Sequence, residues 1–411
     1  MIAPMTHRAN EPASDRGLLR ARHGRGHHRV TFVELFFDLV FVFAVTQLSH
    51  SLIEHFSALG ALQTTLLTLA VWWTWMYTTW VTNWLDPDRL PVRVALLTLM
   101  LPGLILSASI PHAFDTRGLA FAGAYVVIQC GRTIFFLWAV RSHQIMTRNV
   151  QHILVWLSLA GLVWMAGAFV QDAQRLLLWS IALAIDLAAP WAGYWIPGFG
   201  RSMTTDWDVE GGHMAERCAL FIIIALGESL LVTGATFAGL PWTTEVVLAL
   251  VVSFVGSVAM WWLYFDTSAD VGTRTISASR DPGRIARLVY TYIHLLPVAG
   301  IILAAVGDEL VLAHPLGHTE WPTAIPVVGG PFLFILGVWM FKWAIVGRPP
   351  VSPLVAIASL GGLLASAPLM PPLVLMALST VVLVGSAMWE ARTAAACPVP
   401  TTSVAAHPPA P

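Results

Sequence analysis

Apolar runs of about 20 residues alternate with short polar connections over most of the chain. A helix of roughly 20 apolar residues spans the hydrocarbon core of a bilayer, so each run predicts one transmembrane helix. Twelve runs are present, although the last two are separated only by Met370 and prolines and could form two short spans or one re-entrant hairpin. The runs cover residues 30–49, 58–82, 91–110, 118–140, 150–170, 174–195, 214–238, 244–265, 285–306, 323–346, 352–369 and 371–389.

Arginines gather in every second connection between the predicted spans. Because Lys and Arg resist translocation, the basic connections are expected in the cytoplasm. Six arginines precede the first span, whereas the opposite connections contain only Arg117 and Arg175. The alternation predicts that both termini are cytoplasmic. The later basic connections contain Arg89, Arg93, Arg141, Arg148, Arg201, Arg217, Arg274, Arg280, Arg284, Arg287, Arg348 and Arg392.

The composition supports lipid as the main solvent and partner. The chain is 57% hydrophobic and 11% charged, whereas a soluble domain has about 25% charged residues. A net charge of -1 argues against a nucleic-acid partner. The three cysteines include no Cys-x-x-Cys pair, and no Walker loop, nucleophile elbow or dinucleotide fingerprint occurs. We therefore expect no metal and no cofactor, and the oligomeric state stays open.

Four features recur in the same order in the two halves of the chain. Spans one and seven begin with a Glu, spans two and eight share aromatic clusters, spans three and nine share Leu-Pro, and spans five and eleven share Ser-Leu-small-Gly-Leu. We therefore predict an all-α membrane protein of about twelve helices in two parallel six-helix repeats. The predicted segments are a basic cytoplasmic tail (1–29), a first half (30–195), a cytoplasmic linker (196–213), a second half (214–389) and a disordered C-terminal tail (390–411).

Five ordered motifs resemble the low temperature requirement A family. They are ELFFDLVFVFAVTQLS from Glu34, WWTWMYTTWVTNWLDPDR from Trp72, HMAERCALFIIIALGES from His213, WWLYFD from Trp261, and the segment 290–309 with its HLLP and AVGDE pieces. The likeness covers residues 29 to about 347. It implies a bacterial multi-pass protein of the cytoplasmic (inner) membrane, linked by name to growth in the cold. The resemblance implies no settled biochemical activity.

Two carboxylates stand on one face of the first span. Glu34 and Asp38 are four residues apart, which places them together on a helix. Charged groups inside a bilayer usually face a bundle interior or water. One interpretation is a mutually repelling pair that relays protons or binds a cation. The other is simple pairing with Arg93, Arg287 or Arg217 near the same boundary.

The seventh span holds a second polar group and the residue we favour most. His213, Glu216 and Arg217 open the span, where Glu216 either caps the helix or joins His213 in binding a ligand. Two such residues are too few for a metal site. Glu228 lies three turns deeper, near mid-bilayer, and demands a partner. Glu228 is therefore our first choice of functional residue.

The other polar residues of the spans complete the candidates for binding or ion coupling. Arg132 is expected to pair with Asp186, Glu228 or Asp38, either structurally or around a substrate anion. His294 is either a proton carrier or a packing histidine. Lys342 is expected to snorkel to the interface beside Trp343. Asp266 ends the second aromatic cluster, and the two clusters form either a cage for a cation or interfacial belts.

These features favour a proton- or cation-coupled secondary transporter of a small molecule or an ion. An ion channel lined by the first span of each half is the alternative of the same class. A membrane-embedded enzyme that modifies lipid is an alternative of another class, with Asp38, His213 and Glu216 gathered at the cytoplasmic face. We expect no enzyme activity, and the sequence names no substrate, coupling ion or direction.

Overall fold

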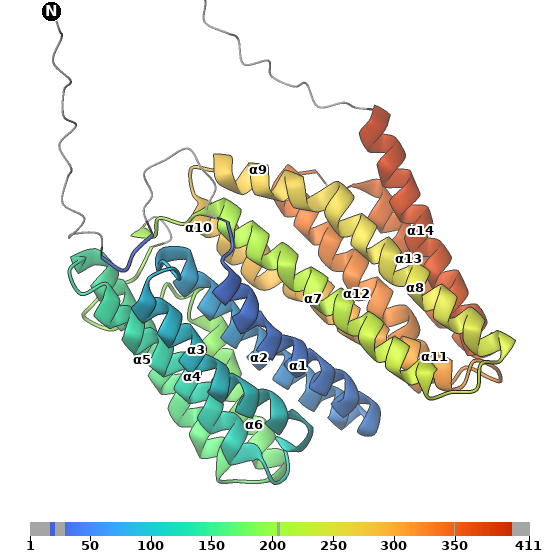
Figure 1. Ribbon diagram of the computed structural model, residues 1–411, viewed down its shortest axis with the longest axis horizontal. Helices are drawn as coiled ribbons and strands as arrows, with labels where there is room; N and C mark the ends of the chain where they lie inside the picture. Colours follow the sequence, from blue (N-terminus) through green and yellow to red (C-terminus); the bar gives the residue numbers. More distant parts are fainter. Residues whose placement is uncertain (1–16, 21–28, 204–205, 349, 397–411) are drawn as a thin grey trace, which may run out of the picture. The chain divides into compact units, whose positions relative to one another are not determined.

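The computed structural model describes residues 17–20, 29–203, 206–348 and 350–396. These residues form helices, with isolated backbone bridges as the only β pairing among them (Figure 1). Ten helical segments are long and apolar enough to cross a membrane. Large side chains such as Phe32 and Leu162 are exposed, at 91% and 70%, as expected where lipid covers the surface. The chain is therefore a multi-pass membrane protein.

Each of the twelve predicted spans coincides with a helix, but two helices lie outside the ten. One is α2 (Ala58–Trp84), whose Trp and Thr residues reduce its hydropathy. The other is α6 (Asp172–Ala188), which has 17 residues. The last two runs form separate helices, α13 (Val351–Ser366) and α14 (Pro372–Ala396). The crossing of the membrane by α2 and α6, and the two-repeat arrangement, stay predictions.

The first compact unit comprises the described residues up to Ile224 together with Thr275–Leu295. In it α1 packs against α2 and α3, α4 packs against α3 and α5, and α5 packs against α6 (Figure 1). The N-terminal part of α7 belongs to this unit. Its remaining elements are α1 (Phe32–Glu54), α3 (Leu90–Ser109), η1 (Ile110–His112), α4 (Gly118–Ala139), α5 (Gln144–Ala168), α10 (Pro282–Ile285) and the π-helix η4 (Ala286–Ile293).

Local sequence explains where the helices of the first unit begin. Thr31 precedes α1 and donates its backbone N–H and its hydroxyl to the Glu34 carboxylate, in the manner of a capping box. The Ser57 hydroxyl accepts from Gly60 N at the start of α2. Pro91 occupies the first turn of α3, where its missing N–H costs nothing. Glu34 therefore stabilises the start of α1, whatever chemical role it also has.

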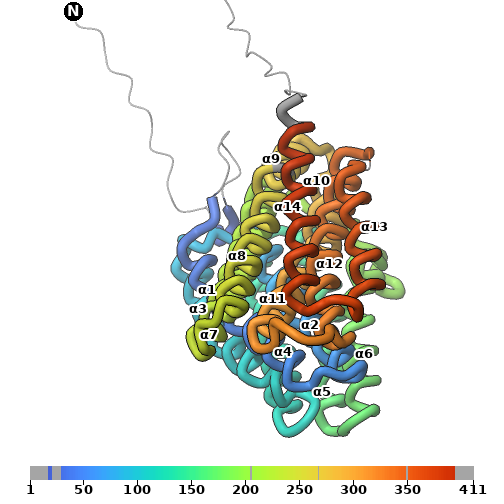
Figure 2. The backbone as a smooth tube through the Cα atoms, turned by 90° about the vertical axis from the view of Figure 1, so that its right-hand side faces the viewer, coloured from blue at the N-terminus to red at the C-terminus, as the bar shows by residue number. Residues whose placement is uncertain are grey.

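The second compact unit comprises Ala225–Arg274 and the described residues from Leu296 onward. In it α8 packs against α14, and α12 packs against α13 and α14, as Figure 2 shows. The rest of α7 (Gly211–Ala238) and the start of α9 (Asp270–Ala278) belong here. The other elements are α8 (Thr244–Tyr264), the π-helix η3 (Phe265–Ala269), α11 (Leu295–Ala313), α12 (Trp321–Val346) and η5 (Ala367–Leu369).

Glycines hold α11 and α12 unusually close together. A Cβ atom added to Gly330 would lie 2.4 Å from the backbone nitrogen of Ala304, and one added to Gly300 would lie 2.5 Å from that of Phe334. Small residues allow helix backbones to approach in this way in membranes. The bounds of the compact units differ from those of the predicted halves, because the units follow contacts and the halves follow the sequence repeat. The predicted halves stay a prediction.

Candidate functional site

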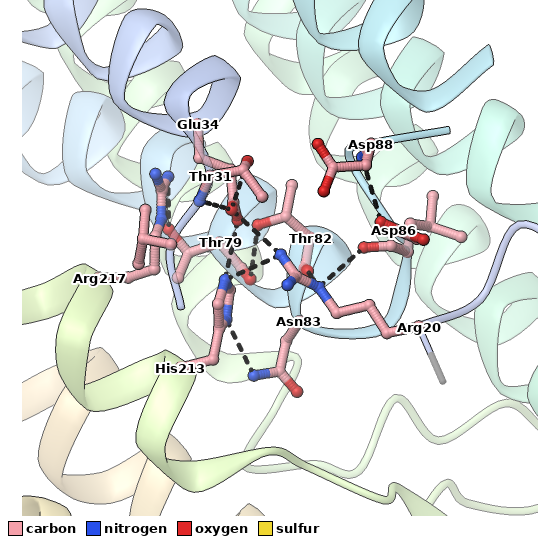
Figure 3. A network of polar contacts seen from close by, with 12 residues as sticks. Arg20, Thr31, Glu34, Thr79, Thr82, Asn83, Asp86, Asp88, His213 and Arg217 are labelled. Atoms are coloured by element: carbon pink, nitrogen blue, oxygen red, sulfur yellow. Dashed lines mark hydrogen bonds and ion pairs between the residues drawn. The ribbon is translucent and has the colours of Figure 1, made fainter. Parts of the chain in front are cut away.

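Five ionisable side chains of the first unit meet in its interior, and we call Arg20, Glu34, Asp38, His213 and Arg217 the charge cluster. Figure 3 labels all of them except Asp38. Each is at most 8% exposed. They come from α1, from α7 and from the short segment before α1. Burying so many charges is costly unless each is paired and hydrogen-bonded, so the pairing decides what the cluster can do.

Glu34 is held from two sides. Its Oε1 lies 2.8 Å from His213 Nε2, and its Oε2 accepts from Arg20 Nη2 at 3.1 Å. Arg20 also donates Nε to the carbonyl oxygens of Thr82 and Leu85, at 2.8 and 3.1 Å. The guanidinium therefore ties the segment before α1 to the end of α2, with Glu34 as its charged partner.

Three side chains surround the ring nitrogens of His213. Arg20 Nη2, a donor, and Glu34 Oε1, an acceptor, lie 3.1 and 2.8 Å from Nε2, so the side of Asn83 decides which tautomer we assign. The Asn83 amide donates to Glu210 O and accepts from Glu210 N, at 2.8 and 2.9 Å. Its NH2 group therefore also faces His213 Nδ1, 3.3 Å away, which must accept. A neutral imidazole that accepts at Nδ1 carries its proton on Nε2. His213 then donates to Glu34.

Asp38 and Arg217 form the second pair of the cluster. Arg217 Nη1 and Nη2 donate to the two carboxylate oxygens at 2.8 and 2.9 Å, which is the strong bidentate geometry. Trp75 Nε1 adds a third hydrogen bond to Asp38 at 2.8 Å, and the guanidinium lies 5.5 Å from the Trp75 ring. Asp38 is therefore fully engaged by residues of α2 and α7.

The structure selects among the pairings expected for the two α1 carboxylates. Asp38 pairs with Arg217, one of the three arginines considered. Glu34 pairs with Arg20 and His213 instead of Arg93 or Arg287. Each carboxylate thus has its own cationic or proton-donating partner. In this geometry each carboxylate has its own ion pair, Glu34 with Arg20 and Asp38 with Arg217, and His213 adds a hydrogen bond to Glu34.

Glu216 contacts the segment before α1, and the cap that was considered for it at the start of α7 is supplied by Glu210. Glu216 is half-buried, and its Oε2 accepts from the backbone N–H of Val30 at 3.1 Å. The side chain of Glu210 caps the start of α7 by accepting from Gly212 N and His213 N. In the described ranges, no group of three or more His, Cys, Asp or Glu side chains is arranged to hold a metal ion.

Arg132 and Asp186 are linked in a separate chain of hydrogen bonds, and their expected direct pairing is wrong. Arg132 donates to Gln129, Gln129 Nε2 donates to the Tyr125 hydroxyl at 3.2 Å, and Tyr125 donates to Asp186 at 2.7 Å. Trp164 Nε1 gives Asp186 a second bond at 3.1 Å. Two neutral side chains of α4 therefore separate the two charges, and Arg132 has no carboxylate partner within ion-pair distance in the described chain.

An aromatic cavity lies beside these networks in the first unit. Its volume is about 90 Å3, and its walls come from α2, α4, α5, η4 and the segment after α6. Arg287 is the charged residue in its wall, and the Nε of that side chain has no hydrogen-bond partner among the described residues. The aromatic side chains in its wall are Tyr77, Trp80, Trp84, Phe136, Tyr194 and Trp207.

Comparisons with known proteins agree on the family. The sequence model of the bacterial low temperature requirement A protein family matches residues 29–388. This chain belongs to the low temperature requirement A family. It is also 37% identical to an uncharacterized protein of Rhizobium meliloti over 369 residues, which is 88% of this chain and 89% of the relative. No solved structure gives a significant match.

The remaining candidates of this low temperature requirement A protein make none of the contacts within the charge cluster. His294 is fully buried in the first unit and stacks on Trp72, with ring centres 6.4 Å apart. Glu228 is buried in the second unit. Asp266 is exposed and accepts from Trp262 Nε1 at 3.1 Å. The first choice made from the sequence, Glu228, is therefore not a member of the charge cluster.

The structure gives partners to three residues for which the sequence did not name them. Lys342 is part-buried and pairs with Glu390 near the end of α14, and its snorkelling to the interface stays a prediction. Arg20 was taken only as a cytoplasmic topology signal, and Asn83 was not considered. The signal for Asn83 was available, since an amide one helical turn beyond Thr79 in an apolar span needs partners.

Proposed function

We propose that this low temperature requirement A protein is a secondary transporter of a small apolar anion, coupled to a proton or a cation. It would work in the bacterial inner membrane with both termini in the cytoplasm and with all twelve helices crossing as two six-helix halves. The charge cluster would be the ion-coupled element, and the aromatic cavity would hold the substrate. Support comes from α2, which both features share.

The two faces of α2 serve the two features. One face contacts the charge cluster through Trp75, Thr79 and Asn83, which recur at intervals of four residues. The opposite face lines the aromatic cavity with Tyr77, Trp80, Val81 and Trp84. A shift of α2 caused by substrate would therefore alter contacts with Asp38, Arg217 and His213. Such differential contact is what couples two binding events.

The cavity wall sets the class of substrate. Its aromatic rings supply a large apolar surface, and the unpaired Nε of Arg287 supplies one donor with positive charge. Apolar pockets with a few convergent polar groups are typical of small-molecule sites. A cationic ligand would be repelled by Arg287, so the aromatic-cage hypothesis for a cation is not carried forward for this cavity. An aromatic anion matches both properties, and the cavity of about 90 Å3 must widen to admit it, because a cavity that holds benzene alone measures about 150 Å3.

Transport of benzenesulfonate by the purified protein in proteoliposomes tests the proposal. This aromatic anion stays charged, so it does not leak through lipid as a neutral acid. We expect uptake driven by a proton or sodium gradient and exchange of internal for external benzenesulfonate. Arg287→Gln should reduce both by at least about tenfold, because a buried charge-assisted contact is worth roughly 1.5 to 3 kcal/mol. Glu34→Gln should abolish gradient-driven accumulation and retain exchange.

The matched control is Arg93→Gln, which removes an exposed cation that is not in the cavity wall. Tryptophan fluorescence monitors binding independently, because Trp80, Trp84 and Trp207 surround the cavity. Equal uptake by the wild type, Arg287→Gln and empty liposomes would overturn the proposal. Currents that follow voltage and ignore ion gradients would identify a channel instead.

A further inference from the structure

A small cavity in the second unit is lined by oxygen-bearing side chains from three helices. Asp308 of α11, Ser253 and Ser257 of α8, and Ser379 of α14 line it, together with Val327 of α12. All of these residues belong to the second compact unit. Nothing in the charge cluster or the aromatic cavity of the first unit involves them.

Asp308 is buried without a counter-ion. Asp308 is 8% exposed, and no cationic group of the described chain lies within ion-pair distance of its carboxylate. An ionised carboxylate in this position needs another source of positive charge. The Lys342–Glu390 pair of the same unit shows the usual solution, in which each charge has a partner.

Two hydroxyl groups of α8 face the cavity. Ser253 and Ser257 are 2% and 4% exposed; the Ser257 hydroxyl has no partner in the described structure, and the Ser253 hydroxyl has none except the Asp308 carboxylate. They are one helical turn apart, so both project from one face of α8, and the Ser253 hydroxyl lies beside Asp308. Buried hydroxyls normally bond to backbone, side chain or water. Two such groups beside an unpaired carboxylate indicate a missing ligand.

A backbone carbonyl of α12 adds a further oxygen. Pro331 lies inside α12 and cannot donate to the carbonyl of Val327 four residues earlier. Ser379 of α14 approaches this carbonyl instead, with 3.3 Å between its hydroxyl and Val327 O. The oxygen retains a second lone pair, and Val327 and Pro331 both line the cavity.

The dimensions and the donors define the ligand. The cavity volume is about 20 Å3, which accommodates one water molecule or one bare ion and excludes an organic substrate. The charged and hydroxyl groups in the wall are all oxygen donors, which suits hard cations, and the two thioethers of Met260 and Met376 that complete the wall are weak ligands for such ions. One carboxylate neutralises one positive charge. We propose that this cavity binds a single sodium ion, with Asp308 as its charged ligand.

This inference deepens the proposed function by naming sodium as the coupling ion and Asp308 as its ligand, and in that respect it rests on it. The charge cluster would then respond to sodium binding through movement and would not itself hold the ion. Sodium binding is nevertheless measurable without transport. Failure of benzenesulfonate uptake with intact sodium binding would reject the substrate alone. Intact uptake without sodium binding would reject this site and leave the proton as the coupling ion.

Thermal unfolding of the full-length protein in detergent tests the site. Sodium chloride is titrated against choline chloride at constant ionic strength. We expect a saturable rise in Tm of about 3 to 6 °C, since ligand at many times its Kd stabilises the folded state. Potassium should require at least about tenfold higher concentration, because the cavity is small.

Two variants and one control decide the result. Asp308→Asn should abolish the sodium-dependent rise in Tm. Ser257→Ala removes one donor without changing charge, and it should raise the sodium concentration at half-effect by about tenfold, as expected for one lost hydrogen-bond-strength contact. Glu320→Gln removes an exposed carboxylate from the same unit and should behave as the wild type. Equal responses to sodium, potassium and choline, or an unchanged sodium response in both variants, would overturn the proposal.

Discussion

The two compact units handle buried charge in opposite ways. In the first unit, Asp38 receives two hydrogen bonds from Arg217 and one from Trp75. In the second unit, Asp308 is surrounded by serine hydroxyls and a proline-freed carbonyl, with no cation beside it in the described chain. One carboxylate is neutralised by protein, and the other is left to be neutralised by something else.

This difference indicates which carboxylate can bind and release an ion at a small cost in free energy. A buried bidentate ion pair is strongly destabilised when either partner leaves, since the other charge then stays uncompensated. A carboxylate held among neutral oxygens can gain and lose a small ion without breaking a protein contact. The ion pairs of the charge cluster should therefore stay intact, and their contacts with α2 would transmit movement of that helix. The Asp308 site should be able to bind and release sodium.

Arg217→Met should have the largest effect on this comparison. Removing the guanidinium leaves Asp38 buried and unpaired, which costs about 3 to 5 kcal/mol. We expect a loss of that size in the free energy of unfolding, measured by SDS titration in mixed micelles, and a large drop in membrane accumulation.

The double variant Asp38→Asn with Arg217→Met is the control. It removes both charges, so we expect most of the lost stability to return. If Arg217→Met lowers the free energy of unfolding by less than about 1 kcal/mol, Asp38 is neutralised in some other way. The two units would then not differ in how they neutralise a buried carboxylate.

Gly330→Ala should have a medium effect in the second unit. Its new Cβ would lie 2.4 Å from Ala304 N, so the α11 and α12 backbones must separate. Overpacking of this kind costs about 1 to 3 kcal/mol, and it should also weaken sodium binding because Asp308 is on α11 and Val327 on α12. Both quantities are read from the thermal titration.

Gly361→Ala in α13 is the matched control, because its Cβ would meet no atom within 4 Å. It should not reduce stability, since alanine is the better helix former. Comparable losses in the two glycine variants would show that the α11–α12 approach does not matter.

Asp308→Asn should have the smallest effect when sodium is absent. The carboxylate has no counter-ion to lose, so the free energy of unfolding in choline buffer should change by less than about 1 kcal/mol, in the range of ordinary substitutions. The sharp contrast with Arg217→Met is measured in the same SDS titration. A loss above about 2 kcal/mol would mean that Asp308 is held by a structural contact of the protein.

The positions of the helices could be predicted from the sequence because the bilayer requires an apolar run for each one. Even so, the run 285–306 became the longer segment Pro282–Ala313, which includes the π-helix η4. A π-helix depends on local packing and hydrogen bonding. Apolar periodicity carries no such information, so η4 was not predicted.

The partners within the site could be predicted only in part. Arg217 was one of three arginines at a suitable depth for Asp38, and helix packing across 179 residues of sequence made the choice. Arg20 was missed because it lies outside the apolar runs, in a segment whose sequence has no helical periodicity to indicate that a side chain is buried. Asp308 was seen only inside a family motif, although the pair Ser253 and Ser257 on one face of α8 could have drawn attention to it.

The long sequence separation between Asp38 and Arg217 has a consequence for biosynthesis. Helix α1 leaves the ribosome 179 residues before its arginine partner exists. At roughly 5 to 20 residues per second, the wait is on the order of ten to forty seconds. Glu34 meets Arg20 early, because the two are 14 residues apart, but Asp38 must be sheltered by the insertion machinery or enter the bilayer protonated. Helix α1 therefore cannot complete its packing until α7 has been synthesised and supplies Arg217.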